Sequence, residues 1–279
     1  MAGTLHVVGV PIGNIDDMTP RAINVLQNVD VICAEDTRKA KALFSHLNIQ
    51  PSAKLISHHA HNEHESVQGI LKLLQQGQNV ALITDGGMPA ISDPGYLLVK
   101  AAREEGVNVD VAPGVTAVTT ALALSGLPCH NFYFAGFLPR KKGQAEEAIE
   151  AIKNLPAALV FYESAKRVTA TLTFLAGQLG TDRQACLARE LTKTHQEVLK
   201  GSLGELVETC QRKADLLGEV VLVVAPPDGE ESINWQAVDD EIKQLLDGAL
   251  KTKQVRDKIA QKFGLSKSLI YKRILSHNR

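Results

Sequence analysis

Apolar positions in the first 113 residues follow two alternating spacings. Short runs rich in Val, Ile and Leu predict strands, and stretches with apolar residues three or four positions apart predict amphipathic helices. The alternation of strand and helix predicts an α/β fold with a largely parallel sheet and helices on both faces. The predicted strands are 5–10, 30–34, 54–57, 80–84 and 107–112, and the predicted helices are 19–28, 36–47, 62–76 and 94–105.

Two of these helices have a recognisable start. Thr19 precedes Pro20, and Asp93 precedes Pro94. In each pair a side-chain oxygen that can cap a helix comes just before a proline suited to the first helical position. We therefore expect Thr19 and Asp93 to cap the helices that follow them.

The second half of the chain predicts another α/β domain and a helical tail. After Pro113 and Gly114 comes a helix of small residues at 115–125, and further strands are predicted at 131–135, 158–163, 185–190 and 219–225. Residues 226–231 contain two prolines and a glycine, which is typical of a linker. Helices are predicted at 235–250, 254–263 and 267–277. The predicted domains are 1–113, 114–227 and 232–279.

The composition is that of an ordinary globular protein, with 44% hydrophobic and 22% charged residues. No apolar run is long enough for a membrane span, and the N-terminus lacks the basic start of a secretory signal. The four cysteines are far apart, which fits neither a disulfide framework nor a metal knuckle. These features predict a cytoplasmic protein.

The net charge of −1 hides an asymmetry. Residues 251–279 contain nine Lys and Arg against one acid, Asp257, so this segment carries +8 and the rest of the chain −9. Ala260, Gly264 and the Ser266 that precedes the last helix resemble a helix–turn–helix unit. The alternatives are a nucleic-acid contact and a solvated basic cap, and the charge favours the first.

Glycine-rich loops follow two of the predicted strands, where α/β sheets bind ligands. The segment from Gly9 to Gly13 does not have the dinucleotide-binding spacing. Residues 86–95 contain three glycines and two prolines but no lysine for a phosphate. This loop therefore predicts a small-molecule site that uses backbone groups rather than a phosphate-binding loop.

Charged residues cluster after three other strands, at 35–38, 163–167 and 189–193. Any one cluster is explained by a helix cap with a local ion pair, but several beside glycine loops favour a shared cleft. Four histidines lie at 58, 59, 61 and 64 without a nearby cysteine. This segment is better explained as a polar loop that enters the next helix, and we expect no metal.

Seven motifs together resemble the tetrapyrrole methylase superfamily. They are GVPIGN, AEDTRKAKALF, HHAHNEHE, DGGMPAISDPGY, APGVTAVTTALALSGLP, FYES and ARELTKTHQE, in this order between residues 9 and 197. Within the superfamily the chain resembles the enzymes that methylate the ribose 2′-hydroxyl of a cytidine in small-subunit (16S) ribosomal RNA. The resemblance implies two α/β domains with S-adenosylmethionine in the cleft between them, a homodimer, and ribosomal RNA or the assembled 30S subunit as substrate.

The resemblance also implies the residues of the site. Superfamily members often have an aspartate where this chain has Met88, so we expect Asp85 to take that polar role. Residues expected to contact the cofactor are Pro11, Asp85, Gly86, Gly87, Met88, Ile91, Ser92, Thr116, Ala117, Tyr162, Glu163 and Leu191. Candidates for the general base are Glu35, Asp36, Glu63 and Glu163. Candidates for RNA binding are Arg38, Arg167, Arg189, Lys193, Lys262, Lys267, Lys272 and Arg273.

Two other functions stay open at this point. One is methylation of a corrin or porphyrin ring, which would leave the basic tail without a role. The other is a non-enzymatic regulator that binds nucleic acid through residues 254–275 and senses a ligand in the body of the protein.

Overall fold

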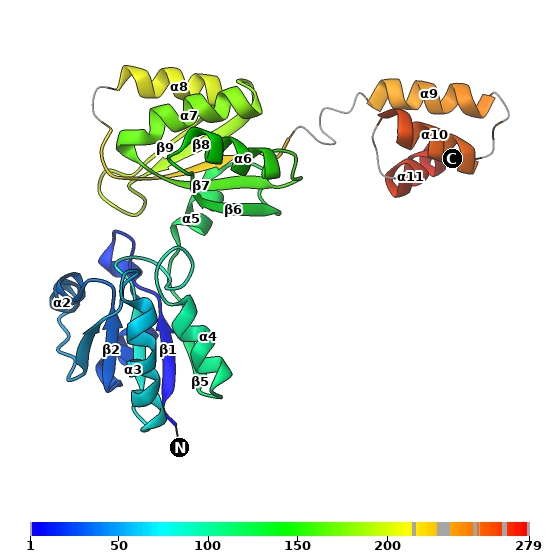
Figure 1. Cartoon of the computed structure of the whole chain (residues 1–279). Coiled ribbons are helices and arrows are strands. Elements are labelled where there is room, and N and C mark those ends of the chain that lie inside the picture. The colour runs from blue at the N-terminus through cyan, green and yellow to red at the C-terminus, as the bar shows by residue number, and fades with distance from the viewer. Residues whose placement is uncertain are drawn as a thin grey trace. The chain divides into compact units, whose positions relative to one another are not determined.

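The computed structural model describes residues 2–213, 216–227, 235–247, 250, 252–263 and 267–277. Residues 1–227 form one compact unit, and residues 228–279 form a second (Figure 1). The first unit contains two five-stranded sheets. The predicted boundary at residue 113 falls between these sheets, and the division into three domains stays a prediction.

The first sheet confirms the predicted parallel α/β arrangement. Its strand order is β3-β2-β4-β1-β5, and every pairing is parallel. The strands are β1 (Thr4–Val8), β2 (Val31–Ala34), β3 (Lys54–Ser57), β4 (Val80–Ile83) and β5 (Asn108–Ala112). The helices are α1 (Pro20–Asn28), α2 (Thr37–His46), α3 (Glu63–Gln75) and α4 (Tyr96–Glu104), with a short 3-10 turn, η1 (Ile15–Asp17).

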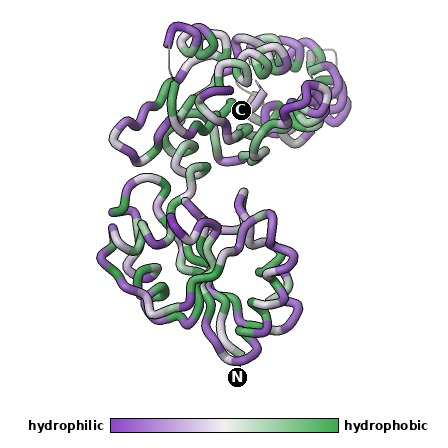
Figure 2. Tube along the Cα trace, turned by 60° about the vertical axis from the view of Figure 1, so that its left-hand side comes forward, coloured by the Kyte–Doolittle hydropathy of each residue, from purple (hydrophilic) through white to green (hydrophobic). Residues whose placement is uncertain are grey.

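Both faces of this sheet are covered, because alternate residues of each strand point to opposite sides. Ile32 of β2 packs with α1 and α2, whereas its neighbour Cys33 packs with α3 and α4. The strands therefore run as apolar segments through the middle of this half of the unit, with hydrophilic segments outside them (Figure 2). This is the pattern expected of a buried parallel sheet.

The second sheet is mixed. Its order is β6-β7-β10-β8-β9, in which only β6 and β7 pair in parallel. The strands are β6 (Phe132–Phe137), β7 (Ala158–Ser164), β8 (Gln184–Arg189), β9 (Glu197–Ser202) and β10 (Glu219–Val224). Helix α5 (Ala117–Ser125) packs on one face, and α6 (Lys142–Ile152), α7 (Ala165–Leu179) and α8 (Leu203–Arg212) pack on the other.

The sequence pattern did not predict strand β9. It is an edge strand that pairs only with β8 among the described residues, and none of its residues is fully buried. Its two charged residues, Glu197 and Lys200, break the apolar run that marks the inner strands. An edge strand of this kind carries too few apolar residues to be recognised by spacing alone.

One of the two predicted helix starts is confirmed and the other is wrong. Thr19 caps α1, and its hydroxyl accepts a hydrogen bond from the Ala22 amide. Helix α4 begins at Tyr96 rather than at Pro94, and its N-cap residue is Gly95, with φ 133°. Its first amides donate instead to the Glu63 carboxylate, at 2.8 Å from Gly95 and 3.2 Å from Leu97. The carboxylate therefore replaces Asp93 as the cap, which leaves the Asp93 side chain for another role.

The loops that follow β1, β4 and β5 lie in contact. The amides and carbonyls of Val10 and Gly87 exchange two hydrogen bonds, at 2.9 and 3.0 Å. Gly9 lies so close to Gly114 that a Cβ atom on Gly9 would be 2.6 Å from the Gly114 nitrogen and 2.6 Å from the Met88 sulfur. Both positions therefore need glycine because of a close backbone approach.

The second unit consists of α9 (Trp235–Asp247), α10 (Thr252–Phe263) and α11 (Lys267–His277). Its core includes Val238, Ile242, Val255, Ile259 and Ile270. The predicted turn at Gly264 and cap at Ser266 lie outside the described residues, as do most of the predicted linker residues, 228–231.

Acidic residues of α9 and α10 neutralise part of the basic tail. Three pairs connect Lys262 to Glu241, Lys267 to Asp257 and Arg273 to Asp239. Residues 228–279 contain ten Lys and Arg against eight Asp and Glu, a net charge of +2. The +8 of the last 29 residues is therefore largely balanced within this unit. Among the helices described, none is long and apolar enough to cross a membrane.

We predict that Gly9→Ala lowers the free energy of unfolding by about 1–3 kcal/mol, because the added methyl group must displace the Gly114 backbone or the Met88 side chain. Urea unfolding followed by circular dichroism measures the change. The control is Gly69→Ala in α3, where a Cβ meets nothing within 4 Å and should stabilise the helix by about 0.5–1 kcal/mol. Equal stabilities of Gly9→Ala and wild type would contradict the close approach.

Candidate functional site

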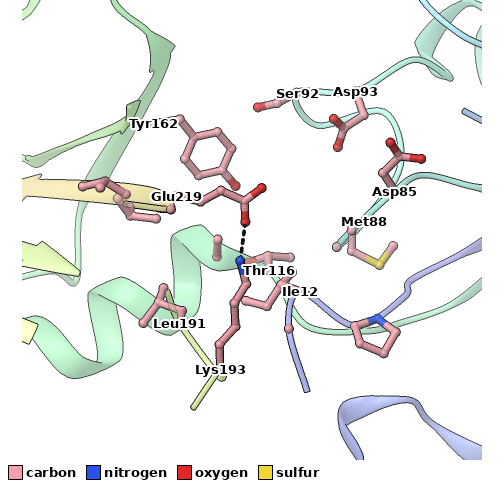
Figure 3. A pocket seen from close by; sticks show the side chains of 18 of the residues that line it. Ile12, Asp85, Met88, Ser92, Asp93, Thr116, Tyr162, Leu191, Lys193 and Glu219 are labelled. Atoms are coloured by element: carbon pink, nitrogen blue, oxygen red, sulfur yellow. Dashed lines mark hydrogen bonds and ion pairs between the residues drawn. The ribbon is translucent and has the colours of Figure 1, made fainter. Parts of the chain in front are cut away.

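A cavity of about 810 Å³ lies where the loops of both sheets meet (Figure 3). Its walls come from the carboxyl ends of β1, β4, β6, β7 and β8 and from the start of β10, which runs antiparallel to β7 and β8. The volume is in the range of about 300–1,000 Å³ that is usual for small-molecule sites. The location is the one that α/β sheets commonly use for ligands.

Backbone segments form much of the wall. Pro11, Ile12 and Gly13 lie along one side, held by the hydrogen bonds between Val10 and Gly87. Gly13 in turn packs against Lys193, and the Asn14 amide donates to the Thr192 hydroxyl at 3.0 Å. The loop after β1 therefore contacts both the first sheet and the loop after β8.

Non-glycine residues with positive φ occur beside the cavity. Ala90 has φ 65° in the loop after β4, and Glu190 and Thr192 have φ 51° and 65° on either side of Leu191. Such conformations cost energy for residues other than glycine and tend to occur at ligand sites. Here they surround two wall residues, Ile91 and Leu191.

The cavity wall contains more acidic than basic side chains. Its carboxyl groups are Asp85, Asp93, Glu163 and Glu219, and its lysines are Lys39 and Lys193. Both lysines are paired: Lys39 with Asp85 at 2.8 Å, and Lys193 with Glu190 at 2.8 Å and Glu219 at 3.1 Å. The wall therefore suits a positively charged ligand better than a phosphate.

Asp93 has the environment of a general base. Its pKa is raised from 3.8 to about 6, first by burial and then by the nearby carboxyl groups of Glu35 and Asp85. The Asp93 side chain lies on the same wall as Asp85 and Ser92, across the cavity from Tyr162 and Glu219 (Figure 3). A carboxyl group that titrates near neutral pH in a cavity is a candidate for proton transfer.

Of the four acids expected to include the base, only Glu163 lines the cavity. It is 3% exposed, and its carboxylate accepts hydrogen bonds from Ser164 and Thr171 and lies 3.6 Å from Arg167. These contacts hold it in place and satisfy its charge. Glu163 therefore has the surroundings of a structural anchor at the end of β7.

The other three acids lie outside the cavity wall. Asp36 caps α2 and pairs with Arg38, whose hydrogen bonds hold the Asp36 pKa well below its usual range. Glu63 accepts the first amides of α4. Glu35 has a raised pKa, caused first by burial and then by Asp85. The charge of Glu35 contributes to the raised pKa of Asp93.

All twelve residues expected to contact the cofactor line this one cavity. The fold thus brings residues that are up to 180 positions apart in the sequence, such as Pro11 and Leu191, into one wall. Their contact with a cofactor stays a prediction. The sequence did not point to Lys39, Phe137 or Glu219, which also line the cavity. Their strand and helix positions carry no glycine motif, so no local signal identified them.

The residues expected to bind RNA have different surroundings. Arg38 is 90% exposed in its side chain, although it pairs with Asp36. Lys193 lines the cavity, whereas Arg167 lies 3.6 Å from the wall residue Glu163 and Arg189 pairs with Glu197 at 3.3 Å. In the second unit Lys272 is exposed, and Arg273 pairs with Asp239 and stacks over Trp235 at 4.3 Å. RNA binding by these residues, and by Lys262 and Lys267, stays a prediction.

The histidine segment forms a turn before α3. His58 is 1% exposed, and its Nδ1 lies 2.8 Å from the Ser66 hydroxyl. Burial lowers the pKa of His58. Within the described part of the chain, no group of three or more His, Cys, Asp and Glu side chains is arranged to hold a metal ion.

Comparison with known sequences gives strong similarities. The model of the family described as Tetrapyrrole (Corrin/Porphyrin) Methylases matches residues 4–207. The chain is 42% identical over 275 residues to a protein of Halalkalibacterium halodurans named Ribosomal RNA small subunit methyltransferase I, covering 96% of this chain and 93% of that protein. A protein of Escherichia coli O157:H7 with the same name is 40% identical over 273 residues, with 97% and 94% covered.

Solved structures show the same fold at lower identity. Diphthine synthase has a TM-score of 0.59 at 14% identity and covers 80% of this chain and 89% of its own. Uroporphyrin-III-C-methyltransferase from Thermus thermophilus has a TM-score of 0.54 at 21% identity, with 80% and 94% covered. At these identities the likeness concerns the fold alone.

We predict that Asp93→Asn stabilises the protein at pH 8. A carboxyl group whose pKa is raised in the folded state stabilises the fold when it is protonated. This stabilisation is complete below the unfolded pKa of 3.8 and is lost as the pH rises through about 6. The charged carboxylate is therefore unfavourable at pH 8, on the order of 1 kcal/mol after solvent screening. Urea unfolding should show a gain at pH 8 that is smaller at pH 5.

Glu147→Gln, at an exposed position of α6, is the control for this change and should show no such pH dependence. A gain for Asp93→Asn that is the same at both pH values would contradict the raised pKa.

Proposed function

Because the chain belongs to the tetrapyrrole methylase family, we propose that it methylates the 2′-hydroxyl of a cytidine in the 16S RNA of the small ribosomal subunit. It is a methyltransferase, and the family uses S-adenosylmethionine as methyl donor. The observation that carries the proposal is the cavity, whose wall combines all the expected cofactor residues with a carboxyl group of raised pKa.

The RNA substrate is supported by the relatives that match nearly the whole chain at about 40% identity, because their name specifies small-subunit ribosomal RNA. The choice of the ribose hydroxyl of a cytidine rests on the sequence motifs. Methylation of a tetrapyrrole is the weaker alternative, because the structures named for it share only the fold. Because ribosomal small subunits lie in the cytoplasm, we propose that the enzyme acts there.

The cavity fits S-adenosylmethionine by its chemistry. The cofactor carries no phosphate, and both wall lysines are already paired with carboxylates. Its sulfonium and ammonium groups are positive, which suits a wall with four carboxyl groups and two lysines. Backbone groups of the segments at 11–13 and 86–88 would hold its adenine and methionine ends, with Thr116, Tyr162 and Leu191 alongside.

When bound, S-adenosylmethionine supplies an electrophilic methyl group on a sulfonium. The protein's task is then to align the ribose hydroxyl and to receive its proton. Alignment of two reacting groups is worth up to about 7–11 kcal/mol of the barrier. The acceptor hydroxyl is a weak nucleophile at neutral pH, so a positioned base adds about 10²–10⁴-fold.

Among the carboxyl groups of this wall, we select Asp93 as the base because of its raised pKa. Its pKa of about 6 leaves the carboxylate mostly deprotonated at pH 7, yet makes it a stronger proton acceptor than an ordinary aspartate. Glu35 and Asp85 favour the protonated form of Asp93 by electrostatic repulsion of its charge. The pairing of Lys39 with Asp85 tempers this effect. We propose that the proton from the ribose hydroxyl moves to Asp93.

We predict that Asp93→Asn lowers kcat for methyl transfer by about 10²–10⁴-fold, because the amide cannot accept the proton. Transfer of a labelled methyl group to small subunits that lack the modification measures the rate, and calorimetry measures cofactor affinity, which should change little. Glu147→Gln is the matched control and should retain wild-type activity. A kcat for Asp93→Asn within threefold of wild type would exclude Asp93 as the base.

The substrate itself is tested with three acceptors under the same conditions: assembled small subunits, the RNA extracted from them, and uroporphyrinogen. Methylation of either RNA acceptor supports the proposal. Methylation of uroporphyrinogen alone would favour the tetrapyrrole alternative instead.

We also propose that two copies of the chain associate. Six of the nine residues of α5 are apolar, and the apolar side chains of such a helix are normally buried. Yet Leu124 of α5 is 45% exposed, and Val111 on the edge strand β5 is 43% exposed. A second copy that covers these side chains would complete their burial.

Light scattering should give twice the chain mass of 30.1 kDa for wild type. Leu124→Asp should shift the protein to the monomer mass, because it places a charge in the apolar contact. Leu217→Asp, at a position that is 66% exposed, is the control and should remain a dimer. A monomeric wild type at micromolar concentration would contradict the association.

A further inference from the structure

The end of β6 presents an aromatic side chain at the cavity. Phe137 lines the cavity and is 60% exposed. Its ring lies 5.6 Å from that of Tyr162, at an interplanar angle of 63°. Tyr162 also lines the cavity, so the exposed face of Phe137 lies beside the site and not on a remote surface.

A β-bulge produces this placement. The pairing of β6 with β7 shifts register between Phe134 and Gly136, and Gly136 has φ 66°. In a regular strand, residues three apart point to opposite faces. Phe134 and Phe137 nevertheless both contact the Tyr162 ring, at 4.8 and 5.6 Å, because the bulge inserts an extra residue between them. Bulges of this kind re-aim side chains beside functional sites.

Three basic residues follow Phe137 after Leu138 and Pro139. Arg140, Lys141 and Lys142 are all exposed, and they begin within three residues of the ring, or about 11 Å of extended chain. Lys142 lies 3.8 Å from Glu146, and no ion pair is found for Arg140 or Lys141 in the described part of the chain. Arg167 pairs with Glu163 and also donates a hydrogen bond to the Leu138 carbonyl at 3.5 Å, which fixes the backbone between the ring and the three cations.

This arrangement differs in charge from the cavity. The inner wall is acidic and its lysines are paired, whereas the segment at 137–142 has three exposed cations and no acid. A ligand that carries both a π-face and a chain of negative charges matches the segment. Single-stranded nucleic acid has these properties, because its bases stack on aromatic side chains while its phosphates contact Lys and Arg.

We propose that residues 137–142 form a docking rim for single-stranded RNA, in which the Phe137 ring stacks on a base and Arg140, Lys141 and Lys142 contact the phosphates. This inference rests on the proposed function, since it concerns how the RNA substrate reaches the same cavity. In this proposal, the bulge in β6 places the stacking surface of Phe137 at the cavity. It also places a binding surface on the first unit, independent of the basic tail.

Binding is measured by fluorescence anisotropy with a labelled single-stranded RNA of about 20 nucleotides, over a series of salt concentrations. The triple variant Arg140→Ala, Lys141→Ala, Lys142→Ala should reduce the slope of log K against log salt by about 2, since each phosphate contact on a single strand contributes about 0.7. Its affinity at about 0.1 M salt should fall at least tenfold.

Phe137→Leu keeps an apolar side chain against Tyr162 but removes the aromatic face. It should weaken RNA binding by about 5- to 100-fold without a change in salt slope, and Phe137→Trp should restore the affinity. Cofactor affinity is measured by calorimetry for each variant. If Phe137→Leu lowers cofactor affinity as much as RNA affinity, the ring belongs to the cofactor site and the stacking role is overturned.

The matched control is the triple variant Lys54→Ala, Lys72→Ala, Lys100→Ala, which removes the same charge from the first sheet and its helices. It should bind RNA like wild type. If the variant at 140–142 keeps the wild-type slope while wild type binds and methylates RNA, the rim is overturned and the proposed function stands. If wild type methylates no RNA acceptor, the proposed function fails and the rim fails with it.

Discussion

The pair of hydrogen bonds between Val10 and Gly87 is the constraint on which the site depends. It joins the loop after β1 to the loop after β4, and the close approach of Gly9 and Gly114 adds the segment after β5 to the same contact. Parallel strands end at the same edge of a sheet, so the loops that follow them lie near one another. The hydrogen bonds and the glycine contact join these loops into one surface. Held together, they form a wall from backbone groups, which a ligand without phosphates can use.

Charge is arranged in two zones around that wall. Inside, four carboxyl groups face two lysines that are already paired, and burial, with the nearby charges of Glu35 and Asp85, raises the Asp93 pKa to about 6. Beyond the cavity, the segment after β6 carries exposed cations. In the proposed function, a cationic cofactor and a polyanionic substrate would meet complementary surfaces of one unit. The second unit contributes less charge than its last residues imply, because Glu241, Asp257 and Asp239 pair with its cations.

The sequence predicted the elements whose signals are local. The parallel sheet, the Thr19 cap and the loops around the cavity follow from apolar spacing, a capping pair and glycine motifs. The start of α4 was not predictable in this way, because its cap is Glu63, which lies 32 residues from Gly95. Asp93 was missed for the same reason: local chemistry marked it as a cap, while its raised pKa depends on burial and on the nearby charges of Glu35 and Asp85, all of which the fold creates. Strand β9 was missed because an exposed edge leaves little apolar pattern.

The proposed transfer of the ribose proton to Asp93 is tested by the pH dependence of kcat/KM, since this ratio reports groups of the free enzyme. We expect kcat/KM to fall about tenfold per pH unit below about 6, where the Asp93 carboxyl group becomes protonated. Glu35→Gln should move this limb to lower pH, because it removes a charge that raises the Asp93 pKa. A value of kcat/KM that is constant between pH 5 and 8, or a pH-dependent fall that persists unchanged in Asp93→Asn, would exclude Asp93 as the proton acceptor.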